Sequence, residues 1–142
     1  MKKLFLSCLL TLTAALTLSA TTIDPQKKWA AVIRAIAQVE SEGNPKSVSK
    51  CGRYVGYLQI SEILVRQCNQ ILGKQVYTYD DRLDKQKSIE MFIVFQEYFN
   101  KEGNMEKAIR LWNSGDINCM KRKRPTEGYY RKVLAQLTAL AN

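Results

Sequence analysis

Glu40 stands at a position that would prepare a carboxylic acid for proton transfer. In a helical projection at about 100° per residue, it falls on an apolar face. The other members of that face are Trp29, Ile33 and Ile36. Burial and the negative end of a helix dipole both disfavour an ionised carboxylate, and the turn-forming Gly43 ends the helix just beyond. We therefore expect Glu40 to have a raised pKa and to act as a general acid near neutral pH.

Two structural interpretations compete with this one. Glu40 could direct its carboxylate into water at the helix end, or it could form an ion pair with Arg34 or Arg53. Periodicity alone leaves all three open. The residues that follow Glu40 favour the catalytic interpretation.

Three blocks of the sequence share the order of a known family's motifs. The first block contains Glu40-Ser41, Gly43-Asn44-Pro45, Val48-Ser49, Gly52 and Gly56-Tyr57-Leu58-Gln59-Ile60. It resembles the signature of the lytic transglycosylases of the soluble-enzyme (SLT) type, which are relatives of goose-type lysozyme. KAIRLWNSG at 107–115 resembles the family's Ala-Tyr-Asn-Ala-Gly block, and TEGYYRKVL at 126–134 resembles its closing Thr-x-x-Tyr helix.

The resemblance implies a mainly α-helical, lysozyme-like α+β fold with a small β lobe beside the catalytic cleft. It also implies cleavage of the β-1,4 bond between MurNAc and GlcNAc in peptidoglycan. Glu40 would protonate the glycosidic oxygen while the substrate's own N-acetyl group stabilises the cationic centre. The C6 hydroxyl would then attack, with Glu40 as the base, to give 1,6-anhydromuramic acid. No cofactor is implied.

The resemblance also implies a set of substrate-binding side chains. They are Ser49, Tyr57, Gln59, Asn113 and Tyr129. Other roles stay open: Ser49 could satisfy its own turn and Gln59 could brace the β lobe. Tyr129, or its neighbour Tyr130, could simply pack in the core.

The chain departs from the family pattern at three points. One extra residue lies between Ser49 and Gln59, so residues 53–55 replace a shorter turn of small residues. Tyr57 occupies a position that is usually leucine. Trp112 stands where the family usually has tyrosine, which removes a hydroxyl near the acid.

A glycosidase usually needs a second carboxylate as nucleophile or base. Candidates are Glu42, Glu62, Asp80, Asp81, Asp84 and Asp116. None stands out by position, so a mechanism with a single acid/base glutamate is the simplest hypothesis. The alternatives are a hydrolytic lysozyme, a non-catalytic wall-binding module, and a cationic membrane-active protein, for which no extended basic amphipathic helix is present.

Length and composition allow one domain, because 142 residues with 46% apolar side chains support a single modest core. Periodicity and end signals predict helices over 24–40, 61–72, 84–101, 104–112 and 127–141. Between them we expect a small irregular hairpin or extended lobe over 48–60 and a loop over 76–83. Apolar residues surround much of the 84–101 segment, which predicts that it is the buried central helix.

Residues 1–20 have the pattern of a signal peptide, with Lys2-Lys3 before an apolar run and small residues at Ser19-Ala20. We expect cleavage near Ala20, a mature domain over 21–142, and a periplasmic or secreted protein without an integral membrane span. An uncleaved anchor is the alternative. Cys8 lies within the apolar run rather than after it, which argues against lipid attachment.

The charge balance points to an anionic polymer. The whole chain carries a net charge of +9, and removing residues 1–20 leaves 20 basic and 13 acidic residues, or +7. Peptidoglycan glycan strands are the expected partner, a cell-envelope secretion or conjugation complex is a further candidate, and we expect a monomer. A merely solvated basic surface is the alternative. The run Lys121-Arg122-Lys123-Arg124 contains no aromatic side chain, so we expect no nucleic-acid partner.

Histidine is absent, which excludes a Ser-His or Cys-His hydrolase, and no Cys-x-x-Cys pair is present to suggest zinc. We expect no metal. Cys51, Cys68 and Cys119 remain in the mature chain. One hypothesis is a Cys51–Cys68 disulfide with Cys119 free, and the alternative is three free thiols.

Overall fold

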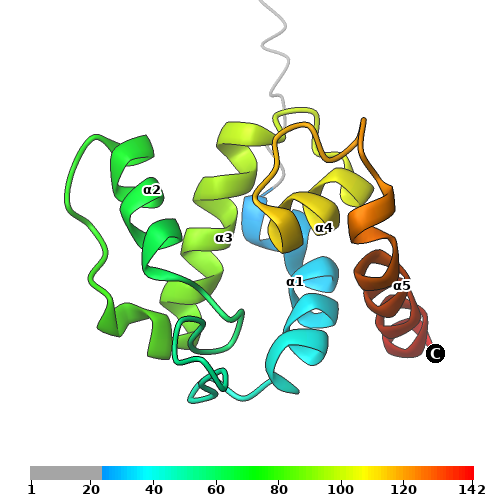
Figure 1. Cartoon of the computed structure of the whole chain (residues 1–142), viewed down its shortest axis with the longest axis horizontal. Helices are drawn as coiled ribbons and strands as arrows, with labels where there is room; N and C mark the ends of the chain where they lie inside the picture. The colour runs from blue at the N-terminus through cyan, green and yellow to red at the C-terminus, as the bar shows by residue number, and fades with distance from the viewer. Residues whose placement is uncertain (1–23) are drawn as a thin grey trace, which may run out of the picture.

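The computed structural model describes residues 24–142, and this part of the chain is mainly helical (Figure 1). The α-helices are α1 Pro25–Ser41, α2 Glu62–Leu72, α3 Lys85–Phe99, α4 Met105–Ser114 and α5 Glu127–Ala141. Two short 3₁₀ helices, η1 Asp80–Leu83 and η2 Arg124–Thr126, lie in the connections. The five α-helices lie where the sequence predicts them, and η1 occupies part of the segment expected to be a loop.

Local capping chemistry explains where the helices begin and end. The Asp24 carboxylate accepts from the Gln26 backbone N–H at 3.0 Å, just before α1. Asp84 and Asn104 cap α3 and α4 in the same way. Because such a side chain satisfies a backbone N–H that the helix leaves unpaired, these residues fix the helix starts.

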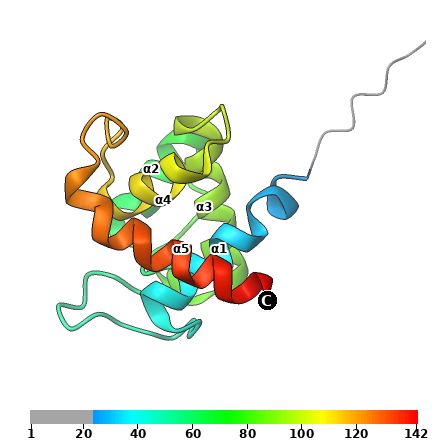
Figure 2. The same ribbon diagram turned by 90° about the vertical axis from the view of Figure 1, so that its right-hand side faces the viewer.

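Helix α3 is the central element, as its apolar sequence predicts. It lies between α2 on one side and α1 on the other (Figure 1), and α5 packs along α1 and against α4 (Figure 2). Phe92 of α3 is fully buried, with its ring centroid 6.0 Å from that of Trp29 and 4.9 Å from that of Trp112. This aromatic cluster joins α1, α3 and α4, the elements around the candidate site.

The segment from Val48 to Ile60 differs from the small β lobe that we expected. Within residues 24–142 it contains no strand, only isolated antiparallel bridges of Val55 with Val48 and with Ile60. Positive φ angles at Gly56 (85°) and Gln59 (52°) close a tight turn between Val55 and Ile60. Because Val55 is shared by both bridges, no run of consecutive pairs forms, and the β lobe is not confirmed.

Gly56 is a point at which this loop packs closely against η1, in the connection before α3. Its backbone approaches the Arg82 carbonyl so closely that a Cβ atom would collide with it. The left-handed φ of Gly56 also favours glycine over any other residue. The loop and η1 are therefore in close contact at Gly56, and Gln59 of the same turn lines the candidate site.

The cysteines do not form the hypothesised Cys51–Cys68 disulfide. Cys68 is buried in α2, where its thiol donates to the Met91 carbonyl of α3 at 3.5 Å. Cys51 is exposed in the loop, and Cys119 is buried. All three are free thiols in the structure, and burial raises the pKa of Cys68 to about 12.

The expected signal peptide lies outside the described residues. Among residues 24–142, no helix combines the length and the apolar character that a membrane crossing requires.

Candidate active site

Glu40 lies in the last turn of α1, which ends at Ser41 with Glu42 in the left-handed conformation. The Tyr129 hydroxyl of α5 donates to Glu40 Oε1 at 2.7 Å. Burial raises the pKa of Glu40, and the bond from Tyr129 offsets part of that rise by favouring the carboxylate. The raised pKa agrees with the expectation from the helical projection.

The competing interpretations of Glu40 find no support in this geometry. The side chain is partly buried rather than extended into water, and no described cation forms a salt bridge with it. Arg53 instead lies beside the exposed Cys51, whose pKa falls to about 7 because Ser49 and then Arg53 hydrogen-bond to the thiol. Glu40 therefore keeps a protonatable carboxyl group with one hydrogen-bond donor.

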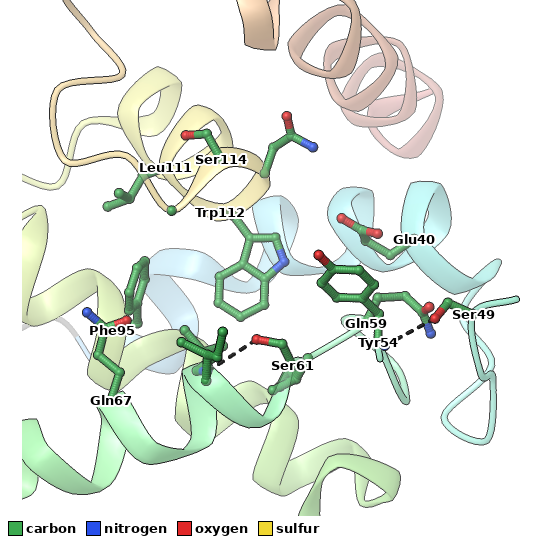
Figure 3. A pocket seen from close by; sticks show the side chains of 15 residues that line it. Glu40, Ser49, Tyr54, Gln59, Ser61, Gln67, Phe95, Leu111, Trp112 and Ser114 are labelled. Carbon is green, nitrogen blue, oxygen red and sulfur yellow. Dashed lines mark hydrogen bonds between the residues drawn. The ribbon is translucent and has the colours of Figure 1, made fainter. Parts of the chain in front are cut away.

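Glu40 opens onto a cleft of about 560 Å³ (Figure 3). The cleft is lined by α2, the end of α4, Phe95 of α3 and the loop between α1 and α2. Glu40 is the only acidic residue among its described lining residues. None of the six candidates for a second carboxylate lines this cleft; for example, Asp84 caps α3 and Asp116 pairs with Arg122.

Three of the predicted binding residues line the cleft: Ser49, Gln59 and Asn113. Gln59 donates from Nε2 to the carbonyls of Ser47 (3.2 Å) and Gly56 (3.0 Å), so its amide nitrogen braces the turn. Its Oε1 accepts no hydrogen bond from a described residue. Ser49 Oγ accepts from the Tyr54 backbone N–H at 3.1 Å, which fixes the base of the neighbouring loop.

Tyr129 and Tyr130 have different surroundings, although they are adjacent at the start of α5. Tyr129 reaches Glu40, whereas the Tyr130 ring lies under the Arg110 guanidinium, 4.3 Å from its centroid. Desolvation, followed by the charge of Glu40, raises the pKa of Tyr129 well above its usual range. Tyr129 is therefore a neutral hydrogen-bond donor to the acid.

Trp112 takes a structural position in place of the family's tyrosine. Its indole N–H donates to the Leu58 carbonyl at 3.3 Å, and its ring packs on Phe92. One face of the residue also lines the cleft. The indole thus ties α4 to the turn that carries Gln59.

Tyr57, another predicted binding residue, does not line this cleft. It is 5% exposed, and its ring lines a separate hollow beside α1 and the start of α3. Gln59, two residues later, lines the cleft. The alternation of an extended segment fails between them because Gln59 has a left-handed backbone.

Two exposed side chains of the cleft wall were not among the predicted site residues. Tyr54 and Ile63 are 45% and 68% exposed and line the cleft from the loop and from α2. Figure 3 shows Tyr54 directed into the hollow near Trp112 and Glu40. The extra residue between Ser49 and Gln59 could have indicated that Tyr54 lies in an altered part of the cleft wall. No feature of the sequence indicated that Ile63 lines the cleft.

Arg110 was also missed, and it holds the start of α5. This side chain is 2% exposed and lies between α4 and α5. Its guanidinium donates, at 2.7–3.0 Å, to Glu106, Lys123, Thr126 and Glu127. Because Tyr129 lies two residues beyond Glu127, this cluster sets the position from which Tyr129 reaches Glu40.

A family model described as the transglycosylase SLT domain matches residues 20–133. This match covers most of the chain and includes Glu40, the cleft loop and the start of α5. The chain belongs to the SLT transglycosylase family. We found no significant match among curated proteins or among solved structures.

Membership of the SLT family confirms the resemblance of the three sequence blocks. Its members are lytic transglycosylases of the lysozyme-like superfamily that act on peptidoglycan, in the periplasm or outside the cell. A cleft that contains one acidic side chain is consistent with this family.

Proposed function

We propose that the protein is a peptidoglycan lytic transglycosylase that cleaves the MurNAc–GlcNAc β-1,4 bond and forms 1,6-anhydromuramic acid. The observation that carries this proposal is the chemistry around Glu40. It is the only acidic side chain of the described cleft lining, and burial raises its pKa. A single carboxyl group that is protonated before reaction suits an acid that becomes a base within one cycle.

In the proposed reaction, Glu40 donates its proton to the glycosidic oxygen as the bond from that oxygen to C1 of MurNAc breaks. The N-acetyl oxygen of the substrate shares the positive charge at C1. The Tyr129 hydroxyl, 2.7 Å from Glu40 Oε1, stabilises the carboxylate that forms. The C6 hydroxyl then bonds to C1 and returns its proton to Glu40, so water is not consumed.

We propose that Ser49, Gln59 and Asn113 bind the sugar chain. Each lines the cleft beside Glu40. The Gln59 Oε1 atom supplies an acceptor for a hydroxyl or acetamide N–H, because its Nε2 is already used by the turn. Tyr54 adds an aromatic surface on which a sugar ring can pack.

The proposal includes an export route: residues 1–20 are a signal peptide cleaved near Ala20, and residues 21–142 act as a monomer in the periplasm or outside the cell. A net charge of +7 for the mature chain favours contact with an anionic wall polymer. Involvement in a secretion or conjugation complex remains one candidate setting for that contact.

Mass spectrometry of muropeptides tests the reaction. Purified peptidoglycan is incubated with the protein and with Glu40→Gln, and the new glycan ends are identified. We expect anhydromuramic ends with the parent protein and none with the variant. Reducing ends would instead identify a hydrolase, and wall binding without any new ends would identify a non-catalytic module.

A further inference from the structure

A second hollow lies apart from the catalytic cleft, between α1 and the start of α3. It has a volume of about 170 Å³. Its polar lining residues are Gln26, Arg34, Tyr57 and Lys85, and three apolar side chains of α1 and α3 complete it. It contains no acidic residue among its described lining residues. A small apolar hollow with several donors and no acid suits an anionic group.

Tyr57 supplies a hydroxyl that the fold does not use. The residue is 95% buried, yet its hydroxyl makes no hydrogen bond with a described residue, whereas its backbone carbonyl accepts from Ser41 Oγ at 2.7 Å. No fully buried polar side-chain atom of residues 24–142 lacks a partner. The Tyr57 hydroxyl is therefore not fully buried, and Tyr57 is one of the residues that line the hollow.

Two cations, Arg34 and Lys85, line the hollow together with Tyr57. Lys85 Nζ lies 4.9 Å from the centroid of the Tyr57 ring. Arg34 lies close enough that its charge favours the ionised phenol, against the larger effect of burial, which raises the Tyr57 pKa. Neither Arg34 nor Lys85 takes part in a salt bridge with residues 24–142.

We propose that this hollow binds a carboxylate group, and that its ligand is the carboxyl end of a peptidoglycan peptide stem. A guanidinium can hold both oxygens of a carboxylate, and the Tyr57 hydroxyl and Lys85 ammonium add two more donors. The apolar part of the lining suits a small aliphatic group beside the carboxylate. The identity of the ligand rests on the proposed function, since peptidoglycan carries such stems.

The hollow is linked to the catalytic cleft by one turn. Tyr57 lines the hollow and Gln59 lines the cleft, and Ser41, the neighbour of Glu40, holds the Tyr57 carbonyl. A stem bound here would give the protein a second point of contact with the wall polymer, outside the sugar-binding cleft. Binding of stem-bearing strands would then exceed that of bare glycan.

Binding measurements on Glu40→Gln test the proposal without turnover. The probes are a free stem peptide ending in a carboxylate, the same peptide ending in an amide, and inorganic phosphate. We expect the carboxylate peptide to bind about tenfold more tightly than the amide, because hydrogen bonds to a charged acceptor are stronger than those to a neutral one. Tyr57→Phe should reduce that preference, and Arg34→Gln with Lys85→Gln should abolish it.

The matched control is Lys121→Gln with Lys132→Gln, which removes the same charge from exposed positions elsewhere. It should keep the full preference. Equal binding of the two peptides, phosphate binding as tight as that of the carboxylate peptide, or a preference that survives the Arg34 and Lys85 changes would overturn the proposal. Free peptide does not need the sugar-binding cleft, so this result is independent of the muropeptide test of the catalytic proposal.

Discussion

Glu40 and Arg110 are two ionisable side chains that the fold removes from water, and they are treated in opposite ways. Arg110 donates to four partners and stacks on Tyr130, so its charge is fully compensated. Glu40 has one donor, Tyr129, and no described cation. Burial raises the Glu40 pKa, whereas ion pairing keeps Arg110 charged and lowers the pKa of Glu127 beside it.

This difference distinguishes a structural site from a site suited to proton transfer. Because its ion pairs keep Arg110 protonated, the Arg110 cluster can join α4 to α5 without taking part in proton transfer. Burial of a carboxyl group without a neutralising cation raises its pKa, which favours the protonated form that a general acid needs. The two sites are connected, because the helix that Arg110 holds carries Tyr129 to Glu40.

The largest expected effect comes from Glu40→Gln. The amide keeps the shape of the side chain but has no transferable proton. We expect turnover of peptidoglycan to fall by about 10²- to 10⁴-fold, the usual contribution of a positioned acid/base, while the chain stays folded. Rates of release of soluble muropeptides measure this change. Near-normal turnover would mean that Glu40 is not the acid.

Whereas Glu40→Gln acts mainly on turnover, Arg110→Met should act mainly on stability. It leaves Glu106 and Glu127 without their shared cation, but both are partly exposed. We therefore expect a loss of about 3 kcal/mol in the free energy of unfolding, at the low end for a broken buried pair. Urea denaturation measures it. Arg131→Met is the control, because Arg131 also pairs with Glu127 but is 77% exposed, and it should change stability by less than about 1 kcal/mol. Equal effects of the two variants would contradict the special role of Arg110.

Tyr129→Phe should have an intermediate effect. It removes the one donor that favours the Glu40 carboxylate, so the Glu40 pKa should rise further and the carboxylate should be less stable during the second step. Loss of one hydrogen bond to a charged group predicts about a tenfold fall in turnover. The alkaline limb of the pH–activity profile should also move to higher pH. Tyr130→Phe is the matched control and should leave turnover and profile unchanged; a shift with Tyr130→Phe instead would reverse the assignment.

The sequence predicted those parts of the fold that local chemistry determines. N-cap residues such as Asp84 and Asn104 bond to backbone N–H groups three residues later, so the sequence predicted the starts of α3 and α4. The predicted 84–101 helix ends earlier, at Phe99, and the predicted 104–112 helix continues to Ser114. The hairpin or extended lobe expected over 48–60 is represented only by the isolated bridges of Val55, so the β lobe is not confirmed. The close approach of Gly56 to the Arg82 carbonyl is a long-range contact that sequence spacing does not indicate.

The site was predictable where a motif carried it. Glu40 lines the cleft, at the position that its helical face and the family blocks indicated. The direction of Tyr57 was not predicted, because a positive φ at Gln59 breaks the alternation that sequence spacing assumes. The role of Arg110 was not predicted for another reason. Its partner on α5, Glu127, is 17 residues away, and no local pattern links these two residues.

The smallest expected effect concerns stability and has opposite signs at Glu40 and Glu106. A raised native pKa means that Glu40 contributes stability fully below its unfolded-state pKa, near 4.5, and loses it as pH rises through the native value. Glu106 has a lowered pKa, because Lys123 and Arg110 bind its carboxylate, so its contribution is present above the unfolded value and is lost as pH falls. A tenfold difference in proton affinity between native and unfolded chain corresponds to about 1.4 kcal/mol.

Glu40→Gln should therefore be neutral or stabilising at pH 7, relative to the parent, and lose this advantage at pH 4. Glu106→Gln should be destabilising at pH 7 and approach the parent at pH 4. Urea denaturation of the three proteins at both pH values tests the pair together. If Glu40→Gln were destabilising at pH 7 and Glu106→Gln were not, the carboxylate of Glu40 would be the compensated one, and the contrast between the acid site and the Arg110 cluster would fail.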